Sequence, residues 1–97
     1  MRIISRKIIR EFCELFPDAQ KSLQAWYADT KQAHWNNPND IKKVYKNVSI
    51  VANNRVVFNI KGNDYRLVVA INYKFSIVYV RFIGTHKEYD KINATEI

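Results

Sequence analysis

The chain has 97 residues, of which 47% are hydrophobic and 13% aromatic, with only two Gly and two Pro. This composition excludes intrinsic disorder and leaves little room for linkers. The net charge is +7, and a single cysteine, Cys13, excludes a disulfide framework. No apolar run is long enough for a membrane span or a signal peptide, so we expect one domain over residues 1–97, in the cytoplasm. Cys13 lies in an apolar helical pattern and is expected to be a buried, unreactive thiol.

The positive charge is concentrated in the middle of the chain. Residues 41–84 carry eight Lys or Arg and one acid, whereas residues 1–40 carry six Lys or Arg and five acids. Such a local basic field is what a polyanion-binding surface requires, because Lys and Arg neutralise phosphates. Charge alone does not distinguish that surface from a solvated basic surface that aids solubility.

The N-terminal part carries two long helical patterns. Residues 1–4 allow a short strand, and from Ser5, a suitable N-cap, apolar residues recur at helical spacing as far as Phe16. Pro17 ends this helix and Asp18 starts the next, which forms a hairpin with it. The apolar stripe of the second helix is predicted to consist of Leu23, Trp26, Tyr27, Thr30 and Ala33.

A shorter third helix is predicted next. Asn37 supplies a cap, Pro38 fixes the first helical position, and Asp40 places an acid in the first turn. Its apolar face is predicted to be Ile41, Val44 and Tyr45. We assign Trp26, Trp35 and His34 to the structure, not to function.

Strand patterns fill the second half. Residues 48–54 alternate but end in Asn53-Asn54, so they form either an edge strand or a loop. Residues 55–61 alternate with the period of a half-buried strand, and Gly62-Asn63 is a two-residue hairpin signal. One face of the hairpin is apolar and the other is basic. The cross-strand pairs are predicted to be Lys61 with Asp64, Asn59 with Arg66, and Val57 with Val68.

The length of the next loop decides which way Arg81 faces. A two-residue loop at Lys74-Phe75 places Arg81 opposite Val68 and beside Arg66, whereas a three-residue loop drives it into the core. Because burying an unpaired guanidinium is costly, we adopt the two-residue loop. Val78, Val80 and Phe82 then lie on the apolar face. The basic face carries Arg55, Asn59, Lys61, Arg66 and Arg81.

The fold class that follows is α+β. We expect a small antiparallel sheet of three to four strands, with two to three helices packed on its apolar face. The basic face is left free for function.

The segment Gly84–Asp90 gathers a histidine, acids and a phenol after the last strand. Cleavage of an RNA phosphodiester needs a base for the 2′-hydroxyl, cations around the phosphate and an acid for the leaving oxygen. His86 is the strongest candidate for proton transfer near neutral pH, with Tyr89 or a lysine as the alternative. No metal-ligand spacing, glycine-rich phosphate loop or nucleophile elbow is present, so we expect no metal and no cofactor. The phosphate clamps are predicted to be Arg66, Arg81 and Lys61.

Several runs of residues carry a resemblance to a known family. FNIKGNDYRL and FIGTHKEYD, preceded by QAWYAD and WNNPNDIK, resemble the HigB toxins of bacterial toxin-antitoxin operons, within the RelE-like superfamily. The similarity extends from the first helix to about Ile92. It implies a metal-independent mRNA endoribonuclease that acts on ribosome-bound message and inhibits translation. It also implies a HigA-like, helix-turn-helix antitoxin as partner, through which alone the chain meets operator DNA.

The alternative function is a non-catalytic basic module that binds RNA or the ribosome, and a third is an interaction protein that holds an acidic partner.

Matching these runs residue by residue gives the site candidates. The resemblance does not say which residue is the base. The catalytic candidates are Arg66, Arg81, His86 and Tyr89, and the RNA-binding candidates are Lys61, Asn63, Arg55, Asn59 and Lys74.

Overall fold

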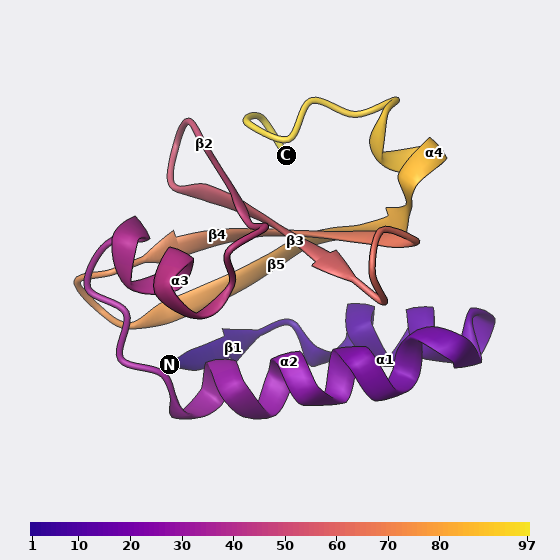
Figure 1. Cartoon of the computed structure of the whole chain (residues 1–97), viewed down its shortest axis with the longest axis horizontal. Coiled ribbons are helices and arrows are strands. Elements are labelled where there is room, and N and C mark those ends of the chain that lie inside the picture. The colour runs from indigo at the N-terminus through magenta and orange to yellow at the C-terminus, as the bar shows by residue number, and fades with distance from the viewer.

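A five-stranded sheet forms the centre of the computed structural model, which describes residues 1–97. The strand order is β1-β5-β4-β3-β2, with β1 parallel to β5 and all other neighbours antiparallel. Helices α1 and α2 lie on one side of this sheet, and the segment after α4 lies on the other (Figure 1). The elements are β1 (Arg2–Ile4), α1 (Arg6–Leu15), the 3-10 turn η1 (Pro17–Ala19), α2 (Gln20–Gln32), α3 (Pro38–Val44), β2 (Ser49–Val51), β3 (Arg55–Ile60), β4 (Tyr65–Asn72), β5 (Ile77–Thr85) and α4 (His86–Tyr89).

The α+β class is confirmed, but the predicted number of strands is wrong. The sheet has five strands and is mixed, because β1 runs parallel to β5 from Arg2 beside Ile77 to Ile4 beside Tyr79. β1 and β2 each contain only three residues, too few for a clear period-two signal. There are also four α-helices, not two to three, since the four residues of α4 form a helix of their own.

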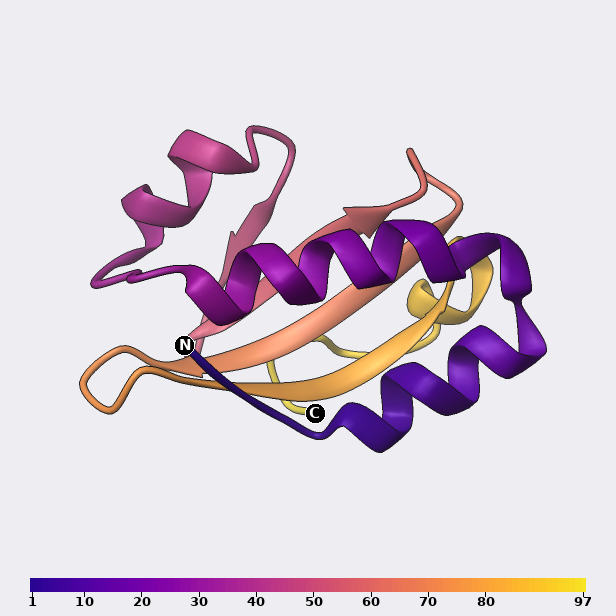
Figure 2. The same ribbon diagram turned by 90° about the horizontal axis from the view of Figure 1, so that it is seen from below.

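The core lies between the sheet and the helices. Figure 2 shows α2 crossing the sheet, with α1 beside it. Phe58 is at the centre of the core, and its ring centroid lies 5.5 Å from that of Trp26, 6.1 Å from that of Trp35 and 5.1 Å from that of Tyr45. Both tryptophans are buried, so their structural assignment is confirmed. The sheet residues of this core are Val56, Phe58, Ile60, Tyr65, Leu67, Val69, Ile71, Val78 and Val80.

The helices follow the sequence signals with three exceptions, which concern a cap, an apolar face and a helix start. Asn37 caps α3 as predicted, its side chain accepting a hydrogen bond from the Asp40 amide at 3.1 Å. Ser5 occupies the N-cap position of α1 but makes no side-chain cap bond. Val44 is 64% exposed, because the short α3 turns only Ile41 fully inward.

The third exception is Asp18, which lies in η1 and does not start α2. Its carboxylate is instead used for tertiary contacts, which are described below. No helix of the chain is both long enough and apolar enough to cross a membrane.

Cys13 is half-buried beside the core and is not fully buried as expected. Burial raises the pKa of its thiol, which disfavours the reactive thiolate. His34 is exposed, on the wall of a surface pocket that it shares with Trp35 and Tyr45.

The β3–β4 hairpin has the predicted register. Asn59 pairs with Arg66, and Val57 pairs with Val68. The Asp64 amide donates to the Lys61 carbonyl at 3.2 Å, so Gly62 and Asn63 are the central residues of the turn. Positive φ values occur at Lys61 (51°) and at Gly62 (65°). Residues 48–54 resolve into the edge strand β2 and a turn in which Asn53 and Asn54 both have positive φ.

Strand β5 contains a bulge that the alternation pattern does not reveal. The β4–β5 turn has four residues, 73–76, and not the predicted two. The predicted pairing of β4 with β5 is nevertheless found from Asn72 beside Ile77 to Val69 beside Val80. Beyond that point Val68 pairs with Phe82, so Arg81 is the extra residue of the bulge.

The bulge reverses the alternation, so the predicted inward orientation of Phe82 is wrong. Ile83 packs against the helix-side core, and Phe82 faces away from the helices. Arg81 stays exposed and is not buried under the helices.

Candidate nucleic-acid interface

The outer face of the sheet, which is the side turned away from α1 and α2, consists of three cross-strand rows on β3, β4 and β5. The first and third rows are four residues apart along a strand, or about 13 Å. Arg81 emerges from the bulge between the first and second rows. The first row is Arg55, Ala70 and Tyr79, the second is Val57, Val68 and Phe82, and the third is Asn59, Arg66 and Gly84.

The middle of this face is apolar, and its residues on β3 and β4 are covered. Val57 is 3% exposed and Val68 is 0% exposed, although neither belongs to the helix-side core. The segment after α4 crosses this side of the sheet (Figure 1). It is attached by hydrogen bonds from Asn53 Nδ2 to the Thr95 carbonyl at 3.0 Å and from Arg55 Nε to the Ile97 oxygen at 2.9 Å. Arg55, a predicted RNA-binding residue, is therefore engaged by this segment.

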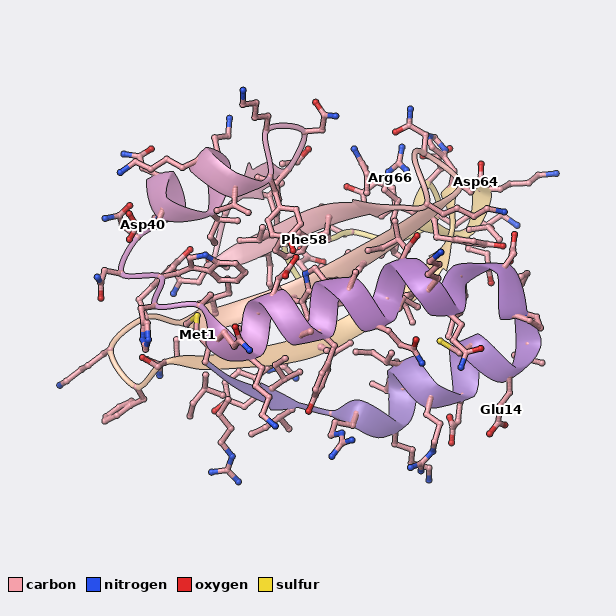
Figure 3. The ribbon with its side chains drawn as sticks, turned by 60° about the horizontal axis from the view of Figure 1, so that its bottom comes forward. Met1, Glu14, Asp40, Phe58, Asp64 and Arg66 are labelled. Carbon is pink, nitrogen blue, oxygen red and sulfur yellow. The ribbon has the colours of Figure 1, made fainter.

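The third row joins Arg66 to the start of α4. Arg66 Nη1 donates to the Asn63 carbonyl at 2.9 Å, and the His86 amide donates to the Asp64 carbonyl at 3.3 Å. Figure 3 shows Asp64 and Arg66 together at one end of the sheet, away from Met1. Two consecutive carbonyls of one turn therefore hold both the cation and the histidine at the same end of the outer face.

The short helix α4 is fixed by a capping box. Thr85 Oγ1 accepts from the Glu88 amide at 3.2 Å, and Glu88 Oε1 accepts from the Thr85 amide at 2.9 Å. These bonds satisfy amides at the helix start that would otherwise lack partners. Residues 85–88, read THKE, carry the sequence signature of this motif. The box makes His86 the first helical residue.

His86 forms a pair with Asp90. Its Nδ1 lies 3.2 Å from Asp90 Oδ2, and the two side chains are 53% and 60% exposed. Because a carboxylate only accepts hydrogen bonds, this contact places a proton on Nδ1 and leaves Nε2 of the neutral ring as an acceptor. Asp90 was not among the sequence candidates, although its spacing of four from His86 on a helix would have identified it. Tyr89 is half-buried at the end of α4.

Lys61 lies on the helix side of its turn. Its Nζ is 2.7 Å from Asp18 Oδ2, and the other carboxylate oxygen accepts from the Tyr65 hydroxyl at 2.6 Å. The Lys61 hydrogen bond, with the Tyr65 one second, holds the pKa of Asp18 below its usual value. The same contacts raise the pKa of Lys61 and raise that of Tyr65 to about 12. The predicted grouping of Lys61 with the outer-face cations is therefore wrong.

The remaining candidates are dispersed. Lys74 is exposed in the β4–β5 turn, at the other end of the sheet, with its Nζ 5.5 Å from the Phe75 ring centroid. Asn59 donates to the Asn47 carbonyl at 3.2 Å. The Arg81 guanidinium lies 5.4 Å from the ring centroid of Tyr79 and is free of ion pairs. The structure thus gathers Asn63, Arg66, His86 and Tyr89 at one end and places Arg81 towards the middle.

These features define a small α+β protein. Helices α1 and α2 cover one side of its sheet (Figure 1), and one end of the other side carries an arginine and a histidine. Residues 19–92 match the model of the HigB_toxin family, described as the RelE-like toxic component of a toxin-antitoxin system. The match covers well over half of the chain, and the protein belongs to this family.

Curated relatives extend the comparison over nearly the whole chain. The mRNA interferase toxin HigB of Escherichia coli strain K12 is 27% identical over 96 residues, which cover 97% of this chain and 92% of that protein. The mRNA interferase HigB of Escherichia coli O157:H7 gives the same values. That of Escherichia coli O6:H1 is 27% identical over 94 residues, which cover 95% and 91%.

Proposed function

We propose that this chain is the toxin of a type II toxin-antitoxin system and cleaves ribosome-bound messenger RNA in the cytoplasm, which stops translation. The observation that carries the proposal is the Asn63-Asp64 turn, whose consecutive carbonyls hold Arg66 and His86 at one end of the outer face. Family membership and the printed names of the relatives, which call them mRNA interferases, support this activity.

The chemistry we assign is attack by the 2′-hydroxyl on the adjacent phosphorus. Nε2 of His86, left free by the contact of Nδ1 with Asp90, accepts the 2′-hydroxyl proton. The 2′-oxygen then bonds to phosphorus while the bond to the 5′-oxygen breaks, which yields a 2′,3′-cyclic phosphate and a 5′-hydroxyl. Arg66, with Arg81 further along the face, offsets the charge that builds on the phosphate oxygens. The proton for the 5′-oxygen comes from a second donor, for which Tyr89 is our candidate.

The partner we infer is a cognate antitoxin of the HigA type with a helix-turn-helix domain. The family description makes the chain one component of a two-component system. Contact with operator DNA then occurs only through the antitoxin. Residues 1–97 act in this scheme as one toxin domain.

Growth and RNA mapping after induced expression test the proposal. Wild-type protein without antitoxin should stop growth and create new 5′ ends that primer extension detects in cellular messages. Arg66→Ala and His86→Ala should remove both effects while circular dichroism stays unchanged. Matched controls are Arg10→Ala, an exposed arginine on α1, and His34→Ala, and both should keep wild-type toxicity.

Three results would change the account. Full toxicity of Arg66→Ala and His86→Ala would remove the site assignment. Growth arrest without new 5′ ends would show a non-catalytic RNA- or ribosome-binding module. Cleavage of purified message at the same rate with and without ribosomes would remove the ribosome from the proposal.

A further inference from the structure

Phe82 is an aromatic side chain that the bulge delivers to the outer face. It pairs with Val68 in the second row and is half-buried. Its neighbour Ile83 packs against the helix-side core, but Phe82 does not. The rings of Phe12, Phe16, Trp26, Trp35 and Phe58 contact other aromatic rings, whereas Phe82 has no such partner. One large apolar ring therefore keeps a partly exposed surface on the outer face.

The position of that ring is set by Gly84. A Cβ added at Gly84 would lie 2.6 Å from Cζ and 3.2 Å from Cε1 of Phe82, so the ring lies over the glycine backbone. The same Cβ would lie 3.2 Å from Glu88 Oε1, which belongs to the capping box of α4. Gly84 pairs with Arg66 in the third row. The Phe82 ring therefore lies between the bulge and the edge that carries Arg66 and His86.

On β5 the cation Arg81 lies between two aromatic residues, Tyr79 and Phe82. Tyr79 also faces outward, and the Arg81 guanidinium lies over its ring at 5.4 Å. Single-stranded RNA is bound by surfaces that combine cations for the phosphates with aromatic rings for the bases.

We propose that Phe82 is a stacking platform for one nucleobase of the bound RNA, next to the phosphate that Arg66 holds. This inference rests on the proposed function and adds to it a contact with a base, which the cations do not provide. Because any base has a flat face, the platform fixes the position of the nucleotide and tolerates several sequences. Gly84 is a positioning residue, since its lack of a side chain lets the tip of the Phe82 ring lie against the backbone.

Abasic RNA provides a direct test. The probe is a message that spans a cleavage site mapped in cells, with a 2′-deoxynucleotide at that site to prevent cleavage. It is used free or on programmed ribosomes, whichever form the wild-type protein cleaves. Replacing each nucleotide in turn with an abasic residue should weaken wild-type binding at one position beside the cleavage site by about fivefold to a hundredfold, as expected for one base–aromatic stack.

Variants then assign that position to the ring. Phe82→Leu should bind the intact message more weakly than wild type by the same factor. On the message that is abasic at the sensitive position, Phe82→Leu and wild type should bind with equal affinity. Phe82→Trp should bind like wild type. Gly84→Ala, which displaces the ring without removing it, should behave like Phe82→Leu. Phe75→Leu is the matched control, because Phe75 is 66% exposed in the β4–β5 turn, and it should bind like wild type.

The outcomes separate the inference from the proposed function. Equal weakening of Phe82→Leu on every abasic message, or wild-type binding by this variant, would overturn the platform even if cleavage occurs. If the protein produces no new 5′ ends, the same abasic scan is run on a message that it binds, and a position-specific loss there would uphold the platform and overturn the nuclease.

Discussion

The two faces of the sheet are made by the same three strands, yet they are organised differently. On the helix side, Phe58, Leu67 and Val78 are fully buried and follow strict alternation. On the outer face, Arg66 and Phe82 are half-buried and Arg81 is exposed. The helix side holds the fold together through apolar area, whereas the outer face keeps cations and a ring accessible to a ligand.

The difference between the faces arises at one residue. The extra residue Arg81 reverses the alternation of β5, so that Arg81 and Phe82 both lie on the outer side while Ile83 returns to the core. β-Bulges commonly re-aim side chains beside active sites. The comparison therefore predicts that substitutions on the helix side change stability and that substitutions on the outer face change activity.

The largest effect is expected from His86→Ala. Loss of the proposed base should lower the cleavage rate by about a hundredfold to ten-thousandfold. The free energy of unfolding should change by less than about 0.5 kcal/mol, because the side chain is 53% exposed and its pair with Asp90 lies at the surface. Single-turnover cleavage and urea denaturation measure the two quantities. A large loss of stability would place His86 with the structural residues.

Leu67→Ala should show the opposite behaviour. Leu67 is 0% exposed on the helix side, so its truncation should lower the free energy of unfolding by about 2–5 kcal/mol. At low temperature the folded fraction should still cleave at the wild-type rate. Thermal and urea unfolding test this, and a cost below about 1 kcal/mol would mean that the helix-side core is not close-packed at this residue.

A smaller effect is expected from Asp90→Asn. The carboxylate orients the His86 ring at 3.2 Å but does not itself contact the substrate in our scheme. The cleavage rate should fall by about tenfold to a hundredfold, the range that loss of an orienting partner of an imidazole gives in metal sites. Since the role is positional, kcat should fall while KM stays near the wild-type value. A rise in KM of about tenfold to a hundredfold with unchanged kcat would instead mean that Asp90 contributes to RNA binding.

The smallest effect concerns Asp18, on the helix side of the β3–β4 turn. Its pKa is lowered from 3.8 by the Lys61 and Tyr65 hydrogen bonds, so the ionised carboxylate stabilises the fold above that pH. The contribution should disappear as the pH falls below 3.8 through the lowered pKa. Wild type should therefore be more stable than Asp18→Asn at pH 7 and match it in strong acid, in urea titrations at several pH values.

The control for this titration is Glu14→Gln, an exposed acid of α1 that forms no ion pair. The difference in free energy of unfolding between Glu14→Gln and wild type should not change with pH. A flat difference for Asp18→Asn as well would mean that the turn is not held by this carboxylate.

Much of the helix side could be predicted from the sequence. Period-two alternation in β3 and β4, with the Gly62-Asn63 turn, was sufficient for the register of Asn59 with Arg66. Signals at Asn37 and Pro38 were sufficient for α3. These features depend on local chemistry, which is why a single sequence reveals them.

The outer face was only partly predictable. Arg66 and His86 could be nominated, but the bulge could not, because inserting one residue in β5 leaves no mark in its apolar pattern. Lys61 was misplaced because its ion pair with Asp18 links residues far apart in the sequence. Asp90 could have been found from its helical spacing to His86.

The central claim is that RNA binds the outer face, and an NMR footprint tests it most directly. Uniformly labelled His86→Ala protein, which should bind without cleaving, is titrated with a message fragment that spans a mapped cleavage site. We predict that amide shifts concentrate at Arg66, Arg81, Phe82 and the start of α4, with α1 and α2 unaffected. Shifts confined to α1 and α2 would contradict the account.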